Sequence, residues 1–173
     1  MNPTPMTPEQ AVEEAIGYEQ RIRDLYREAA DKAVDPTGRK VFGMLADDEQ
    51  RHVEYLEHRL GQLRSNAELT LDEVPTAIPD SKFFQRLEGR IEKELDREDR
   101  NDEKQMLSKA LQVEIETSEF YRRMAEQMTG DVADMFERFL KIEDGHIVAV
   151  QAELDYLSGT GFWFDFQEFD MEH

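Results

Sequence analysis

The chain has 173 residues, which is enough for one domain with a hydrophobic core of its own. It contains no cysteine, and this excludes disulfides, thiolate zinc sites, iron–sulfur clusters and cysteine nucleophiles. Its net charge of −19 repels nucleic-acid phosphates and attracts cations, so we expect no nucleic-acid partner. Any metal site in the chain must therefore use carboxylates and imidazoles.

We expect neither a membrane-spanning segment nor a signal peptide. No apolar run approaches the roughly 20 residues that cross a bilayer as a helix. Residues 1–5 have neither the basic nor the apolar region of a signal peptide. The sequence therefore predicts a cytoplasmic protein with no membrane partner.

Residues 7–61 predict two helices joined by a short loop. The first helix begins after Thr7, which suits the N-cap, with Pro8 at the first helical position and Gln10 completing a capping box. The loop at residues 35–38 ends this helix, and Gly61 is the predicted residue just beyond the end of the second. Their inward faces, at helical spacing, are Val12, Ile16, Glu19, Ile22, Tyr26 and Ala29, and then Phe42, Leu45, Glu49, His52, Leu56 and Leu60.

A long connection is predicted at about residues 62–102, because prolines and turn residues interrupt the periodicity there. Ser81 can cap a shorter helix over about residues 81–97, with an apolar face formed by Phe83, Phe84, Leu87 and Ile91. Residues 96–103 form a charge run that we interpret as a solvated break.

A second helical hairpin is predicted over about residues 103–159, with a turn at Thr129-Gly130-Asp131. The aromatic tail at residues 160–173 is too short to fold alone, and we expect it to contact a second subunit or to cap the bundle. The inward faces are Met106, Ala110, Val113, Glu114, Thr117, Tyr121, Met124 and Met128, and then Val132, Met135, Phe136, Phe139, Glu143, His146, Val150 and Leu154. The sequence thus predicts a single all-α domain over residues 1–173, a four-helix bundle made of two antiparallel hairpins with a long central connection.

The two hairpins resemble each other as an internal repeat. The offset is 95 residues for two pairs and 94 residues for a Glu-x-x-His motif. These coincident offsets predict two hairpins related by a pseudo-two-fold axis. The matched residues are Glu19 with Glu114, Tyr26 with Tyr121, and Glu49-x-x-His52 with Glu143-x-x-His146.

Each apolar stripe becomes polar near its middle, where it carries a glutamate or a Glu-x-x-His pair. Residues three apart lie on one face of a helix, so each pair can point inward together. Unpaired buried carboxylates are costly, and two divalent cations would balance four of them. The set is that of ferritin-like di-metal bundles, and it suits iron or manganese better than calcium. The alternative is that the glutamates lie beside the stripe and reach solvent, with His52 and His146 as ordinary interface histidines.

These motifs resemble the rubrerythrin-like branch of the ferritin-like superfamily over nearly the whole chain. The resemblance depends on Tyr18-Glu19, Glu49-x-x-His52, Glu114 followed by Tyr121, Glu143-x-x-His146 and the long connection. It implies a carboxylate-bridged site for two Fe ions, or Mn or Zn in isolated protein, within a homodimer or larger homo-oligomer. By this resemblance, the metal ligands are Glu19, Glu49, His52, Glu114, Glu143 and His146, with Glu49 and Glu143 bridging and Glu19 and Glu114 terminal.

The chain departs from full-length rubrerythrins in two respects. They carry a Cys-ligated rubredoxin module, for which this sequence has no cysteines. They also carry a further glutamate one turn beyond the third-helix ligand, where this chain has Thr117. Tyr26 and Tyr121 lie two turns beyond Glu19 and Glu114, so they are either hydrogen-bond partners of the ligands or ordinary core tyrosines.

Other histidines and methionines are not predicted to bind metal. We expect His58 and His173 at the surface, because neither follows a glutamate at the required spacing. Four methionines are expected to pack in the core, namely Met106, Met124, Met128 and Met135.

The cluster of glutamates and histidines, together with the resemblance to rubrerythrins, implies the function of a di-iron oxidoreductase. A diferrous pair would react with hydrogen peroxide or dioxygen, as a peroxidase or a ferroxidase, with an unknown electron donor. A second hypothesis is a non-catalytic protein that binds or delivers iron or manganese. A third is a structural bundle that holds no metal in the cell.

Overall fold

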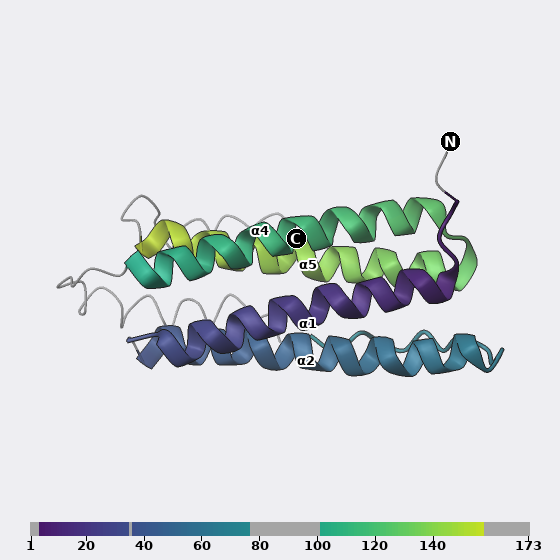
Figure 1. Cartoon of the computed structure of the whole chain (residues 1–173), viewed down its shortest axis with the longest axis horizontal. Helices are drawn as coiled ribbons and strands as arrows, with labels where there is room; N and C mark the ends of the chain where they lie inside the picture. Colours follow the sequence, from purple (N-terminus) through teal and green to yellow (C-terminus); the bar gives the residue numbers. More distant parts are fainter. Residues whose placement is uncertain (1–3, 35, 77–100, 158–173) are drawn as a thin grey trace, which may run out of the picture.

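A computed structural model describes residues 4–34, 36–76 and 101–157 of the chain. These residues form four helices and no strand, which confirms the all-α prediction: α1 (Pro8–Lys32), α2 (Pro36–Arg64), α4 (Asn101–Gln127) and α5 (Gly130–Leu157). Helix α1 packs against α2 and α4, and α4 packs against α5, as expected for two stacked hairpins (Figure 1). The predicted short helix at 81–97 and the aromatic tail lie outside the described residues.

The start of α1 follows the predicted capping box. The Gln10 backbone N–H donates to the Thr7 hydroxyl at 3.2 Å, and the Thr7 backbone N–H donates to the Gln10 side-chain carbonyl at 3.0 Å. Pro8 occupies the first turn, where its missing N–H leaves no helical hydrogen bond unmade. Two of the orphan donors of this helix end are therefore satisfied locally.

The predicted loop at residues 35–38 is too long. Helix α1 ends at Lys32 and α2 begins at Pro36, so residues 36–38 belong to the first turn of α2. Proline tolerates this position because its φ is already helical and its lack of a donor has no consequence there. A proline after an aspartate marked a helix start here rather than a turn.

The prediction that Gly61 ends α2 is wrong. The helix continues to Arg64, and the left-handed residue is Asn66, with φ of 52°. The N–H groups of Asn66 and Ala67 donate to the carbonyls of Leu63 and Gln62 at 3.2 and 3.0 Å, which is the Schellman pattern. Asparagine tolerates this conformation better than most other side chains. The turn predicted at residues 129–131 is confirmed, since Gly130 has a left-handed φ of 60° there.

After α2 the chain returns along the bundle as an extended segment, residues 67–76 (Figure 1). The Tyr55 hydroxyl donates to the Asp72 carbonyl at 3.0 Å. From α5, Arg138 donates to the carbonyls of Leu71 and Asp72 at 3.2 and 3.4 Å. Val74 is buried. The segment is thus attached to both hairpins and brings Pro75 and Thr76 to the middle of α2.

The core consists of two apolar clusters. One contains Ile22, Tyr26 and Phe42, and the other contains Leu56 and Phe136 among its fully buried members. All the predicted inward-facing residues of α1 and α2 are buried, and those of α4 and α5 are buried or partly buried. The polar members of the stripes lie in sequence between the members of the two clusters, so a polar layer interrupts an otherwise apolar interior.

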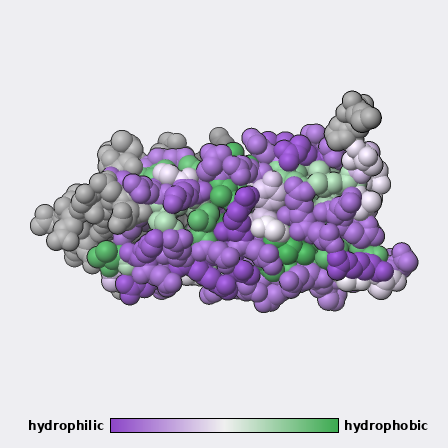
Figure 2. Space-filling model, viewed as in Figure 1, coloured by the Kyte–Doolittle hydropathy of each residue, from purple (hydrophilic) through white to green (hydrophobic). Residues whose placement is uncertain are grey.

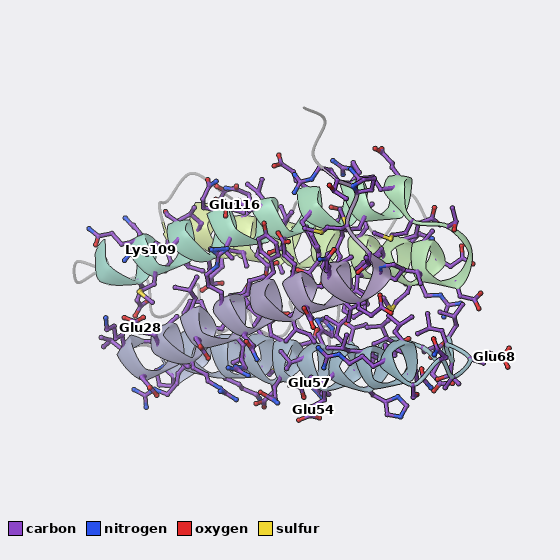
Figure 3. The ribbon with its side chains drawn as sticks, turned by 45° about the vertical axis from the view of Figure 1, so that its right-hand side comes forward. Glu28, Glu54, Glu57, Glu68, Lys109 and Glu116 are labelled. Atoms are coloured by element: carbon purple, nitrogen blue, oxygen red, sulfur yellow. The ribbon has the colours of Figure 1, made fainter. Side chains whose placement is uncertain are left out.

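The surface is mostly hydrophilic on the face that Figure 2 shows. Glu54 and Glu57 on α2 point away from the bundle in Figure 3, as most acidic side chains of so acidic a chain must. Among the described residues, none of the helices combines the length and the apolar character that a bilayer crossing requires.

Replacing Leu56 tests the packing beside the polar layer. Leu56 is fully buried, so Leu56→Ala should lower the free energy of unfolding by about 2–5 kcal/mol, because it removes apolar contacts and leaves a cavity. Urea denaturation measures the change. The control is Ile115→Ala on α4, where the side chain is 37% exposed and the expected change is within about 0.5 kcal/mol. Equal losses in the two variants would contradict the assignment of the core.

Candidate metal centre

Four glutamates, one from each helix, meet in the interior of the bundle. Glu19, Glu49, Glu114 and Glu143 have no exposed surface. His52 and His146 lie beside them and are 0% and 1% exposed. The alternative in which these carboxylates reach solvent is therefore wrong. Each histidine follows its glutamate by three residues, so the helical repeat brings both side chains of the pair to the buried face.

The six side chains form two overlapping groups of four. In each group, one nitrogen or oxygen atom per residue lies within 4.8 Å of the corresponding atoms of the others. Glu49 and Glu143 belong to both groups, which is the arrangement that two bridging carboxylates require. The first group is Glu19, Glu49, His52 and Glu143, and the second is Glu49, Glu114, Glu143 and His146.

Both histidines turn the same ring nitrogen toward the carboxylates. His52 Nδ1 lies 3.1 Å from Glu49 Oε2 and 3.3 Å from Glu19 Oε2. His146 Nδ1 lies 2.7 Å from Glu49 Oε1 and 3.6 Å from Glu114 Oε1. The two rings are stacked, with centroids 5.7 Å apart and planes inclined by 14°. The Nε2 atoms point away from the cluster to other partners.

Two tyrosines cross between the hairpins to reach the carboxylates. The Tyr26 hydroxyl on α1 donates to Glu114 on α4, and the Tyr121 hydroxyl on α4 donates to Glu19 on α1. These two hydrogen bonds are related by the same two-fold symmetry as the sequence repeat. Each tyrosine therefore fixes one oxygen of a carboxylate on the opposite hairpin and leaves the other oxygen for the cluster.

Several buried atoms of the cluster have no hydrogen-bond partner among the described residues. A buried polar atom without a partner costs about 1–3 kcal/mol, and more when it is charged. A cation bound between these atoms would satisfy all of them at once, so the donor set fits a metal centre. These atoms are Glu114 Oε2 and both carboxylate oxygens of Glu143. Glu49 Oε1 and His146 Nδ1 instead lie 2.7 Å apart and pair with each other.

The cluster also shifts the pKa values of its members. Burial and repulsion by Glu49 raise the pKa of Glu19 to about 8, and burial with three neighbouring carboxylates raises that of Glu143 well above its ordinary value. Burial lowers the pKa of His52, but hydrogen bonds to Glu19 and Glu49 outweigh this effect and raise it to about 10. Attraction to Glu49 and Glu143 likewise outweighs burial at His146, whose pKa rises. Without metal, the cluster balances its negative charge by holding protons.

The predictions for the neighbouring residues are confirmed where the structure describes them. Thr117 is fully buried, and its hydroxyl donates to the Val113 carbonyl at 2.7 Å. Glu116 lies at the surface 3.9 Å from Arg21, and Glu119 is exposed, so neither adds a carboxylate to the cluster. His58 is exposed, His173 lies outside the described residues, and the four methionines pack in the core or against it.

Sequence analysis missed three residues beside the cluster. Asp48 is 1% exposed, and its Oδ2 lies 2.8 Å from His146 Nε2. The Pro75 carbonyl accepts from His52 Nε2 at 3.0 Å, and the Thr76 hydroxyl donates to Asp48 at 3.1 Å. Asp48 precedes His52 by four residues, and this spacing places both on one helix face. The spacing could therefore have predicted that Asp48 lies beside the cluster. Nothing in the sequence indicated residues 75 and 76.

Four helices that enclose buried glutamates and histidines define a ferritin-like helical bundle with a candidate metal site. A family model described as Rubrerythrin matches residues 10–154 of the chain. The chain therefore belongs to the rubrerythrin family. Searches of the curated proteins and of the solved structures found no match.

The stability of metal-free protein should fall as the pH rises from about 6.5 to 8. Because the folded-state pKa values of Glu19 and His52, about 8 and 10, exceed their ordinary values of 4.5 and 6.5, the folded state holds excess protons throughout this range. The stabilisation from Glu19 is complete below about pH 4.5 and lost by about 8, and that from His52 is complete below about 6.5 and lost by about 10. Each excess proton contributes a slope of up to about 1.4 kcal/mol per pH unit.

Urea denaturation of chelator-treated protein at several pH values measures this slope. Glu19→Gln keeps the shape of the side chain but cannot titrate, so its unfolding free energy should depend less steeply on pH. An unfolding free energy that is constant or rises between pH 6.5 and 8 in the unsubstituted protein would contradict the protonation argument.

Proposed function

We propose that the buried cluster binds two iron ions and that the pair reacts with hydrogen peroxide or dioxygen. The observation that supports this proposal is the pair of overlapping four-residue groups that share Glu49 and Glu143. Each group offers three carboxylates and one imidazole, and the two shared carboxylates would hold two ions close together. Membership of the rubrerythrin family favours the same assignment.

Charge and ligand chemistry favour iron or manganese. Two divalent ions carry four positive charges, which balance the four carboxylates in a site that excludes water. Calcium prefers sites made only of oxygen ligands, whereas imidazole together with carboxylate suits first-row transition metals. Zinc also accepts these ligands, so we expect isolated protein to bind Mn(II) or Zn(II) when iron is withheld.

Bound as a pair, two ferrous ions supply two electrons together, enough to reduce one hydrogen peroxide, with two protons, to two water molecules. The residues of the chain position and enclose that chemistry. Tyr26 and Tyr121 each hold one oxygen of a terminal carboxylate, and Phe139 packs edge-on against the His52 ring at 5.5 Å. The apolar packing on both sides of the cluster excludes water, which strengthens the electrostatic interactions within it. Sustained turnover would also require an electron donor that returns the ions to the ferrous state.

Thr117 favours a second candidate function, metal binding or delivery without turnover. This position is buried one turn beyond Glu114, and its hydroxyl is engaged by the backbone of its own helix. It offers no carboxylate that could replace a ligand when the oxidation state of the ions changes. A site with one fixed set of ligands suits stable binding of iron or manganese as well as reaction with an oxidant.

Metal stoichiometry tests the ligand assignment. The chelator-treated protein should take up two Fe(II) or two Mn(II) per chain. Glu19→Gln and Glu114→Gln each alter one group and should reduce the stoichiometry to about one, whereas Glu49→Gln alters both groups and should weaken both positions. Elemental analysis after anaerobic gel filtration measures the ratio. Glu54→Gln, on the exposed face of α2, is the matched control and should still bind two ions.

Stopped-flow absorbance distinguishes reaction from binding alone. Anaerobic protein with two Fe(II) per chain is mixed with hydrogen peroxide and, separately, with dioxygen. Reaction at the site predicts a rapid rise of ferric absorbance with at least one oxidant, and a much slower rise for Glu143→Gln, which lacks a shared carboxylate. No rapid change with either oxidant would refute the oxidoreductase and leave the binding function.

A further inference from the structure

We propose that Asp48 makes the two metal positions unequal, because it positions His146 through a charged hydrogen bond that His52 lacks. The position served by His146 is then the tighter one, and the first metal ion binds there. This inference depends on the proposed function, since it concerns the same metal centre.

Asp48 lies on α2 immediately behind the cluster. Its Oδ2 accepts a hydrogen bond from His146 Nε2 at 2.8 Å, on the side of the ring that faces away from the carboxylates. The Thr76 hydroxyl donates to the same oxygen at 3.1 Å, and the side chain is 1% exposed. Asp48 belongs to neither group of four ligands, so its contact with the centre is through the imidazole.

His52 has a different partner on the corresponding ring nitrogen. Its Nε2 donates to the neutral carbonyl of Pro75 at 3.0 Å, and it lies 3.7 Å from Asp48, beyond hydrogen-bond distance. A hydrogen bond to an ionised acceptor is roughly twice as strong as a neutral one. A carboxylate on the outer nitrogen holds the proton there, aims the Nδ1 lone pair at the metal and makes the imidazole a stronger ligand.

The sequence repeat has no carboxylate in the second hairpin at the position that corresponds to Asp48. The offset of 94 residues that relates the two Glu-x-x-His motifs places Ile142 opposite Asp48. Ile142 is partly buried and packs against the apolar core. By the two-fold relation, a carboxylate at position 142 would serve His52 as Asp48 serves His146. The chain supplies an isoleucine there instead, and the connection supplies the Pro75 carbonyl.

A purely structural role for Asp48 predicts different behaviour. In that case the carboxylate would help to attach the connection to α2, as through Thr76, and its loss would lower stability without favouring one metal position over the other. The two roles are therefore distinguished by affinity measured at each position separately.

The test uses two variants that each keep one intact position. Glu19→Gln keeps the group that contains His146, and Glu114→Gln keeps the group that contains His52. Mn(II) is titrated into each variant and into the same variant that also carries Asp48→Asn. The concentration of free Mn(II) is measured by electron paramagnetic resonance. Asp48→Asn should weaken Mn(II) binding by about 10–100-fold in the Glu19→Gln protein and change it little in the Glu114→Gln protein.

Thr76→Val is the matched control, because it removes the link to the connection but keeps the carboxylate. It should leave the Mn(II) affinity of the His146 position unchanged while lowering the melting temperature. A similar effect of Asp48→Asn on both positions, no effect on either, or an equal loss of affinity in Thr76→Val would each overturn the inference.

The unsubstituted protein separates this inference from the proposed function. If it binds no Mn(II) or Fe(II), the metal centre itself is refuted. If it binds two ions, Asp48→Asn should weaken the first binding step more than the second, and this comparison holds even when a single-position variant binds too weakly to measure. Two ions bound with equal affinity, unaffected by Asp48→Asn, would refute only the role of Asp48.

Discussion

The main physical constraint on this structure is the free-energy cost of burying four carboxylates face to face inside a helical bundle. Each would be stable in water, and each becomes expensive when it is buried without a balancing charge. Glu19, Glu49, Glu114 and Glu143 are nonetheless completely buried, and several of their oxygens have no hydrogen-bond partner within the described part of the chain. Protons can balance part of this charge, as the raised pKa values of Glu19 and His52 indicate. Two divalent cations would balance all of it.

The rest of the fold makes that burial possible. Two apolar clusters pack around the polar layer, and the extended segment after α2 attaches to both hairpins. The two tyrosine–glutamate hydrogen bonds join residues 88 and 102 positions apart in the sequence, so the hairpins are held together through the site as well as through apolar contacts. The same residues therefore form the candidate metal site and part of the interface between the hairpins. A substitution in one should affect the other.

The internal repeat gives the site its symmetry, and the exceptions to the repeat give its two halves different properties. Glutamates, histidines and tyrosines recur in both hairpins, whereas Asp48 is matched by Ile142 and the Pro75 carbonyl comes from a segment between the hairpins. A site with identical halves would bind two ions with equal intrinsic affinity. Under the inference drawn for Asp48, unequal partners for the histidines would allow one ion to be held firmly while the other exchanged more readily.

The sequence by itself determined the four helices, their buried faces and the six residues that converge, because helical periodicity places such residues on one face whatever lies opposite. It located helix ends less well, since Asn66 rather than Gly61 adopts the left-handed conformation and Pro36 starts a helix instead of a loop. Only the tertiary structure decided that Tyr26 serves Glu114 rather than Glu19, and that Asp48 and the Pro75 carbonyl hold the two histidines. These contacts join different helices, or a helix and a segment without periodicity. The spacing of residues within one helix does not predict which residue of another element lies opposite them.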